Sequence, residues 1–237
     1  MDNFDANLIK KYVPIEKQKR ALKKLSKGYP VQYIIGNVDF YGQIIKVNKH
    51  VLIPRFETEL LISKTIEYIK KRNFIKPNIL EIGTGSGCIS ILLKQLIDCN
   101  ITAIDKSKNA LKIAKENGKD LDINFICKSI EKFYSNQKFD VLISNPPYVS
   151  FNETTDEKIK YEPQMAIFAK DNGLYFYKII LKKSTLILKP KNIIAFEIGQ
   201  YQAKEIENIA KFYYPLSKVL IEKDLNNKDR YLFIINE

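Results

Sequence analysis

Residues 78–105, NILEIGTGSGCISILLKQLIDCNITAID, contain the pattern that decides the fold. A short apolar run leads into a glycine-rich turn, and a mostly apolar stretch of helical length is followed by a second apolar run that ends in aspartate. This order predicts a strand, a tight turn, a helix and a second strand. Such a unit is typical of a sheet whose parallel strands are joined by helices.

The same alternation continues outward from this unit. Further strands are predicted at 123–127, 139–145 and 192–199, and helices at 58–72, 87–97, 107–118, 174–188 and 202–212. Two closing runs, VLIEKD at 219–224 and RYLFIIN at 230–236, are close enough to pair antiparallel at the edge of the sheet. We therefore expect an α/β fold, a doubly wound and mainly parallel sheet with helices on both faces.

The N-terminal part has a different pattern. Residues 5–27 are rich in lysine, with apolar residues at helical spacing, and Gly28 and Pro30 follow. They predict one or two short amphipathic helices. The segment from Val31 to Ile53 is rich in β-branched and aromatic residues and is interrupted by Gly36 and Gly42, which predicts a short β-hairpin.

Composition narrows the class of protein. A chain of 237 residues suits one α/β domain with a small addition. No apolar stretch has the length of a membrane span, and the N-terminus lacks a secretory signal pattern, so we expect a cytoplasmic protein with no membrane partner. The net charge of +12 comes from lysines spread along the chain, which makes it weak evidence for a nucleic-acid partner.

The glycine-rich turn suits a ligand that lies close to the backbone, because side chains there would obstruct it. Asp105 ends the next strand, 18 residues beyond the last glycine of the turn, close to the ~20 expected for a carboxylate that binds ribose hydroxyls. The spacing is G-x-G-x-G and not the dinucleotide pattern G-x-G-x-x-G, which favours S-adenosyl-L-methionine over NAD. The predicted cofactor-binding residues of the turn are Gly83, Thr84, Gly85, Ser86 and Gly87.

A second motif, Asn145, Pro146, Pro147 and Tyr148, directly follows the strand FDVLIS, at the edge of the sheet where ligand sites form. A planar amide or aromatic amino nitrogen is a poor nucleophile with two N–H donors. The Asn145 side-chain oxygen and the Pro146 carbonyl could each accept one of them, while Tyr148 packs on the planar group. We interpret these four residues as the catalytic site of a methyltransferase that acts on a planar nitrogen.

No metal is expected in this chemistry. Cys88, Cys99 and Cys127 have no CxxC spacing, and His50 is the only histidine. The sequence therefore predicts neither a zinc site nor a disulfide framework.

Several blocks together resemble the peptide chain release factor glutamine methyltransferases, from Pro30 to Arg230. They are PVQYIIG at 30–36, VLIPRFETELL at 51–61, LEIGTGSGCISI at 80–91, SNPPYV at 144–149, YEPQMAIFAKDNGLYFY at 161–177, EIGQYQ at 197–202 and the pair Asp229-Arg230. The resemblance implies a Rossmann-like class I methyltransferase fold. It also implies methyl transfer from S-adenosyl-L-methionine to the N5 amide of the glutamine in the Gly-Gly-Gln motif of a translation release factor, with Asn145 next to both substrates.

Three features depart from this family's pattern. Phe56 stands where the family has a second proline, and Ser129 and Ile130 stand where it has Asp and an aromatic residue against adenine. Ile130 is then the expected contact to the adenine, and a weaker one. The N-terminal region is shorter than in the family, which predicts reduced docking contacts. We divide the chain into a docking segment, 1–53, and an adenosylmethionine-dependent methyltransferase domain, 54–237.

Other classes remain as alternatives. The motif Asn-Pro-Pro-Tyr is shared with methyltransferases that act on amino groups of DNA or RNA bases, because an amide and an aromatic amino group present similar donors. A direct nucleic-acid substrate is not expected, because the chain offers little room for a target-recognition region. A binding protein that has lost catalysis would show damage at the glycines, Asp105 or Asn145, and all are present. We expect a monomer whose partner is a release factor; a related branch of the family acts on a ribosomal protein.

Overall fold

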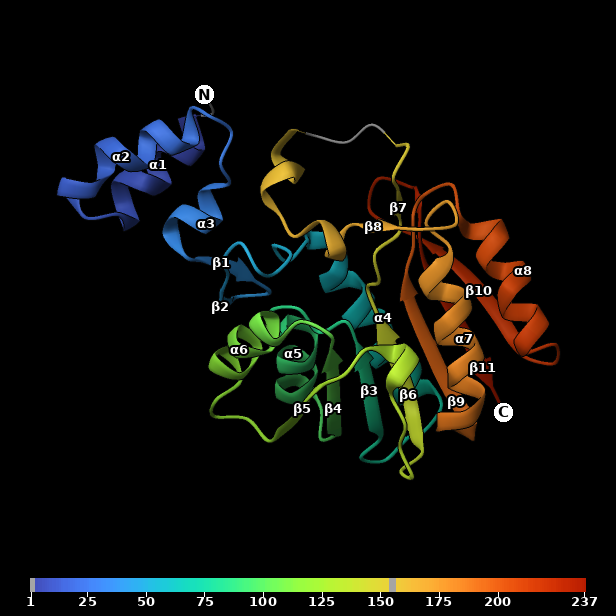
Figure 1. The fold of residues 1–237 in the computed structure, drawn as a ribbon. Coiled ribbons are helices and arrows are strands. Elements are labelled where there is room, and N and C mark those ends of the chain that lie inside the picture. The colour runs from blue at the N-terminus through green and yellow to red at the C-terminus, as the bar shows by residue number, and fades with distance from the viewer. Residues whose placement is uncertain (1–2, 154–156) are drawn as a thin grey trace.

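The computed structural model describes residues 3–153 and 157–237, so the first two residues of the expected docking segment lie outside the described residues. A seven-stranded sheet forms its centre, in the order β10-β11-β9-β6-β3-β4-β5 (Figure 1). The strands are β3 (Asn78–Ile82), β4 (Asn100–Asp105), β5 (Ile123–Cys127), β6 (Phe139–Ser144), β9 (Leu188–Glu197), β10 (Lys218–Lys223) and β11 (Asp229–Asn236). The five strands from β9 to β5 are parallel, and β11 is antiparallel to both β9 and β10. The predicted doubly wound, mainly parallel sheet with an antiparallel edge pair is confirmed.

Helices cover both faces of this sheet. Side chains of the central strands alternate between two cores, as in β11, where Tyr231, Phe233 and Ile235 belong to one core and Leu232 and Ile234 to the other. Helices α4 (Phe56–Lys71), α5 (Cys88–Leu96) and α6 (Lys108–Asn117) pack on the first face, and α7 (Tyr175–Ile187) and α8 (Ala203–Tyr213) on the second. The strands read as nearly continuous apolar runs because both of their faces are buried.

The N-terminal helices form a small core of their own. Helices α1 (Asn3–Tyr12), α2 (Ile15–Leu25) and α3 (Val31–Ile35) bury Ala6, Ile9, Ala21, Leu25 and Val31. They project away from the sheet in Figure 1. The sequence predicted one or two short amphipathic helices over residues 5–27, and the structure has two, α1 and α2.

The prediction of a hairpin over Val31–Ile53 was partly wrong. Only β1 (Asn37–Phe40) and β2 (Gln43–Lys46) pair, and 31–35 is the helix α3. Pro30 precedes that helix with a φ of −56°, and Gly36 ends it at a φ of +92° with its N–H bonded to the Gln32 carbonyl. These two boundary residues outweigh the strand preference of the β-branched residues between them.

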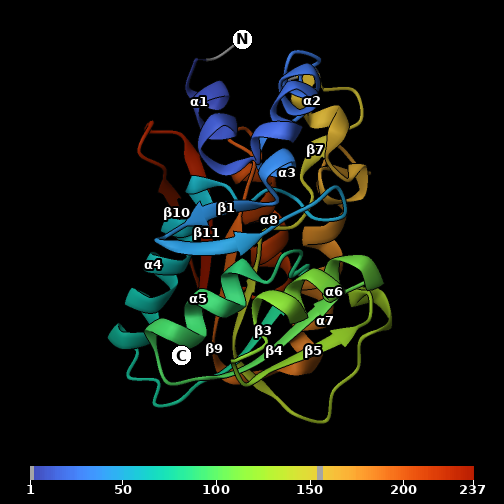
Figure 2. The same cartoon turned by 90° about the vertical axis from the view of Figure 1, so that its left-hand side faces the viewer.

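The hairpin belongs to the main core and not to the N-terminal helices. Phe40 and Ile45 are buried together with side chains of α4 and α5. The end of β2 is tied to α6, because Asn117 accepts a hydrogen bond from the Lys46 N–H at 2.9 Å and donates one to the Lys46 carbonyl at 3.0 Å. Figure 2 shows the hairpin between α1–α3 and the pair α5 and α6.

The polar loop expected at 150–170 contains short regular elements. They are β7 (Val149–Ser150), β8 (Phe168–Ala169) and the 3-10 helices η2 (Glu157–Tyr161) and η3 (Gln164–Ala166); η1 (Ile130–Lys132) follows β5. β7 and β8 pair in parallel, which the sequence did not indicate. Within residues 3–153 and 157–237, no helix has the length and hydropathy needed to cross a membrane.

Candidate active site

The glycine turn joins β3 to α5 at the carboxyl edge of the sheet. Gly83, Gly85 and Gly87 have φ angles of +76°, +55° and +85°, which favour glycine. No atom lies within 4 Å of the position that a Cβ would take at Gly83 or Gly85, and both residues line the same cavity. A ligand can therefore approach the backbone at these two positions.

The other residues of the turn point elsewhere. A Cβ on Gly87 would lie 3.2 Å from Ala114, so this glycine serves the packing of α5 against α6. The side chains of Thr84 and Ser86 are buried and lie outside the cavity lining. Of the five predicted turn residues, Gly83 and Gly85 therefore line the cavity. The other three, Thr84, Ser86 and Gly87, support the turn.

Glu81, for which the sequence predicted no role, accepts hydrogen bonds from the turn and from the start of α5. Its Oε2 accepts hydrogen bonds from the Thr84 hydroxyl at 2.8 Å and from the Ser90 N–H at 3.1 Å. Burial raises the pKa of this carboxyl to about 7. Its Oε1 is a buried acceptor with no partner among the described residues, which fits a ligand that brings a donor such as an ammonium group.

Asp105 ends β4 and lines the cavity. Its Oδ2 accepts from the Gly85 N–H at 3.0 Å, and its Oδ1 accepts from the Ser107 N–H at 2.8 Å. These bonds fix the carboxylate and leave each oxygen a further acceptor position. Two adjacent hydroxyl groups, such as those of a ribose, match this arrangement.

The remaining cavity wall is mainly apolar. Ile104, Ile130, Phe176 and Ile180 line it, and Ile130 is only 3% exposed within η1. Ile130, predicted from the family pattern, therefore lies in the cavity. A slot of this kind accommodates a flat apolar ring system.

The motif after β6 lies between two cavities. Asn145, Pro146 and Pro147 line both the cofactor cavity and a second cavity, which Tyr148 and Arg55 also line. The Asn145 amide nitrogen donates to the Thr58 hydroxyl at 3.1 Å, so the side-chain oxygen points away from Thr58. Three of the four predicted catalytic residues thus line both cavities, and Tyr148 lines the second.

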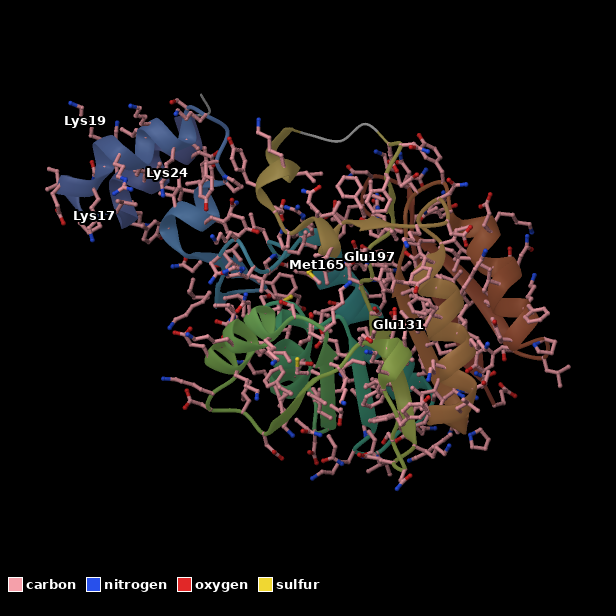
Figure 3. All side chains as sticks on the ribbon, viewed as in Figure 1. Lys17, Lys19, Lys24, Glu131, Met165 and Glu197 are labelled. Atoms are coloured by element: carbon pink, nitrogen blue, oxygen red, sulfur yellow. The ribbon has the colours of Figure 1, made fainter. Side chains whose placement is uncertain are left out.

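Glu197 also lines the second cavity, a role that was not predicted from the sequence. It ends β9 next to the end of β6, and it is 1% exposed. Its Oε2 accepts from the Thr58 hydroxyl at 2.7 Å, and its Oε1 accepts from the Tyr148 hydroxyl at 3.4 Å. Burial raises the pKa of Glu197 to about 7. Figure 3 labels Glu197 together with Met165 and Glu131, which line the first cavity.

Two contacts hold the loops around the second cavity. Arg55 pairs with Glu162 at 2.5 Å, and the other Glu162 oxygen accepts from the Ile53 N–H at 3.1 Å. The Gln202 side chain donates to the Tyr148 carbonyl at 2.9 Å. The segment before α4 and the loop after β6 are therefore fixed relative to each other.

Residues 3–153 and 157–237 contain no group of three or more His, Cys, Asp or Glu that could hold a metal ion.

Comparison with known proteins decides the family. The chain is 38% identical over 222 residues to a release factor glutamine methyltransferase from Enterococcus faecalis, and the match covers 91% of this chain and 79% of that protein. The chain belongs to the release factor glutamine methyltransferase family. This membership confirms the predicted family, the enzyme class and S-adenosyl-L-methionine as the methyl donor.

Other relatives of this methyltransferase differ in length. The chain is 40% identical over 227 residues to a bifunctional methyltransferase from Rickettsia bellii, and the match covers 82% of this chain and 41% of that protein. The chain thus spans less than half the length of that relative. The family model for the methyltransferase small domain matches residues 57–163.

Solved structures support the fold. A release-factor-specific protein-(glutamine-N5) methyltransferase from Alicyclobacillus acidocaldarius aligns with a TM-score of 0.52 at 23% identity, covering 81% of this chain and 99% of that one. At this identity the likeness establishes a shared fold.

Proposed function

We propose that this protein transfers a methyl group from S-adenosyl-L-methionine to the N5 amide nitrogen of the glutamine in the Gly-Gly-Gln motif of translation release factors. The observation that carries the proposal is the position of Asn145 and the two prolines, which line both cavities. A methyl donor on one side and an amide on the other would meet at this segment. The names of the relatives supply the substrate class.

The cofactor cavity has features that fit adenosylmethionine. Gly83 and Gly85 leave the backbone open, and Asp105 presents a fixed carboxylate for the ribose. Ile130 contributes to the apolar slot for adenine, and the free oxygen of Glu81 offers an acceptor near the turn. The bound cofactor supplies an electrophilic methyl sulfonium.

The protein's own residues would orient the target nitrogen. An amide nitrogen carries two N–H donors, and the Asn145 side-chain oxygen and the Pro146 carbonyl are the acceptors offered to them. Two fixed acceptors align the nitrogen and stabilise the positive charge that develops on it during transfer. Pro147 stiffens the segment because its ring fixes φ, and Tyr148 lines the cavity in which the planar group would lie.

The docking segment expected at residues 1–53 has two parts that could contact a substrate. Helices α1–α3 project from the body of the protein, while the end of the segment, at Leu52, lines the second cavity. The expectation that the protein acts as a monomer stays a prediction. Release factors act in translation, so the proposed place of action is the cytoplasm.

One assay tests this function. The protein is incubated with labelled adenosylmethionine and an intact release factor, the same factor with its Gly-Gly-Gln glutamine replaced by alanine, a ribosomal protein, or DNA or RNA alone. Label should appear only on the intact release factor. Faster labelling of nucleic acid would replace this proposal with base amino-group methylation, and labelling of the ribosomal protein would move the substrate to the related branch.

A further inference from the structure

The Thr58 hydroxyl lies between two side chains from different parts of the fold. It receives a hydrogen bond from the Asn145 amide nitrogen at 3.1 Å and donates one to Glu197 Oε2 at 2.7 Å. Thr58 is 3% and Glu197 1% exposed, so water does not compete for these groups. Together the three residues form a continuous chain of hydrogen bonds that ends at the proposed target site.

The direction of this chain follows from the chemistry of its end. An ionised carboxylate only accepts hydrogen bonds, and a hydroxyl has a single hydrogen to donate. The Thr58 hydrogen is therefore committed to Glu197, and the Thr58 oxygen must accept from Asn145. An asparagine amide that donates on this side necessarily turns its oxygen to the other side.

We propose that Thr58 and Glu197 are positioning residues that set the amide orientation of Asn145, so that its oxygen and not its NH2 group faces the target nitrogen. The inference rests on the proposed function of Asn145 as an acceptor. Neither residue touches the reacting atoms in this scheme. If the amide were reversed, its N–H groups would oppose the N–H groups of the substrate amide and productive alignment would be lost.

The surroundings of Glu197 make this orientation sensitive to pH. Burial raises the pKa of the carboxyl to about 7, the Arg230 guanidinium opposes that rise, and Glu57 adds to it. The groups facing Glu197 are Glu57 and Thr58 from α4, Tyr148 from the loop after β6, Tyr177 from α7, and Arg230 and Tyr231 from β11. A protonated Glu197 can donate to Thr58, which allows the reversed chain in which Thr58 donates to the Asn145 oxygen.

The first test is the pH dependence of kcat at saturating adenosylmethionine and release factor, between about pH 5 and pH 9. The wild-type protein should lose activity on the acid side with a midpoint near 7, and Glu197→Gln, which cannot ionise, should lack this decline. Glu153→Gln is the control, because Glu153 is an exposed carboxylate that lines neither cavity. It should keep the wild-type midpoint.

The second test removes the middle of the chain. Thr58→Val keeps the shape of the side chain but leaves the Asn145 amide without its acceptor. The value of kcat should therefore fall about tenfold, which corresponds to the loss of one hydrogen bond. KM for the release factor should change less than about twofold. Thr58→Ser keeps the hydroxyl and should restore kcat. Equal losses in the valine and serine variants would overturn the proposal, as would an acid decline that persists in Glu197→Gln.

A third measurement does not depend on methyl transfer. The side-chain amide signals of Asn145 in a ¹⁵N-labelled protein are identified by their loss in Asn145→Ala. They should shift with a midpoint near pH 7 in the wild-type protein and stay constant in Glu197→Gln. Signals that do not move in the wild-type protein would disprove the positioning role even if the release factor is methylated. Signals that move as expected in a protein that fails to label release factor would disprove only the proposed substrate.

Discussion

The carboxylate of Asp105 accepts a hydrogen bond from the backbone N–H of Gly85 at 3.0 Å. This bond links the end of β4 to the turn that follows β3, so the two predicted halves of the cofactor site are one unit. The turn positions the carboxylate, and the carboxylate fixes the turn.

Replacement of Asp105 by alanine should weaken adenosylmethionine binding. A hydrogen bond to a charged group contributes about 1.5–3 kcal/mol, so the dissociation constant should rise by about tenfold or more. Titration calorimetry measures it, with Asp120→Ala as a control because the Asp120 side chain is 86% exposed. Unchanged affinity in the Asp105 variant would mean that the ribose is held elsewhere.

Asn145→Ala should lower turnover by about 10²–10³ while cofactor affinity stays within a few-fold, because the lost oxygen aligns the target nitrogen. Release-factor labelling and calorimetry measure the two quantities separately. Asn136, in an exposed position before β6 and thus at the opposite end of that strand, provides the control substitution. Near-normal turnover of Asn145→Ala would remove this residue from the mechanism.

Local signals account for what the sequence could predict. The turn at Gly83–Gly87 and the aspartate after the next strand are close in sequence, and the β-α-β pattern determines how they meet in space. The motif at Asn145 was placed correctly because it follows a strand of the same sheet. All of these inferences require only the order of strands and helices.

Contacts between residues far apart in the sequence could not be predicted from these local patterns. Thr58 and Glu197 are 139 positions apart, and no local pattern pairs them. Glu197 could have been suspected, because a carboxylate at the end of the apolar strand NIIAFE would lie at the same sheet edge as Asn145. The helix at 31–35 was missed because its residues favour strands, although Pro30 and Gly36 on either side are residues that often bound a helix.

Arg55→Ala should lower the free energy of unfolding by about 1–3 kcal/mol, because it removes the charge partner of the buried Glu162 carboxylate. Urea denaturation measures the change. Lys71→Ala is a suitable control, since its pair with Glu67 is exposed on both sides and should contribute far less to the free energy of unfolding. Equal effects of the two substitutions would show that the Arg55 pair does not hold the loops.

Glu197→Gln should gain stability relative to the wild-type protein as pH rises. The folded-state pKa of Glu197 is raised from 4.5 to about 7, so the stabilising contribution of its protonated form is complete below about 4.5 and is lost as pH rises through about 7. The difference between variant and wild type should grow by on the order of 2–3 kcal/mol from pH 5 to pH 8. Urea denaturation at both pH values tests it, with the exposed Glu153→Gln as control. A constant difference would contradict the prediction.

Gly85→Ala and Gly87→Ala should separate ligand binding from packing within the same turn. Both positions have positive φ, so each alanine should cost about 1–2 kcal/mol of stability. The methyl group at Gly85 would stand in open space of the cofactor cavity, and adenosylmethionine affinity should fall by about tenfold or more. The methyl group at Gly87 would lie 3.2 Å from Ala114 and 3.3 Å from Ile91, so the Gly87 variant should lose more stability than the Gly85 variant. The Gly87 variant should also bind adenosylmethionine more tightly than the Gly85 variant does. Urea denaturation without cofactor and titration calorimetry give the two quantities. The assignment of Gly85 to ligand binding and Gly87 to packing would be wrong if the Gly85 variant were the less stable of the two, or if it bound adenosylmethionine more tightly.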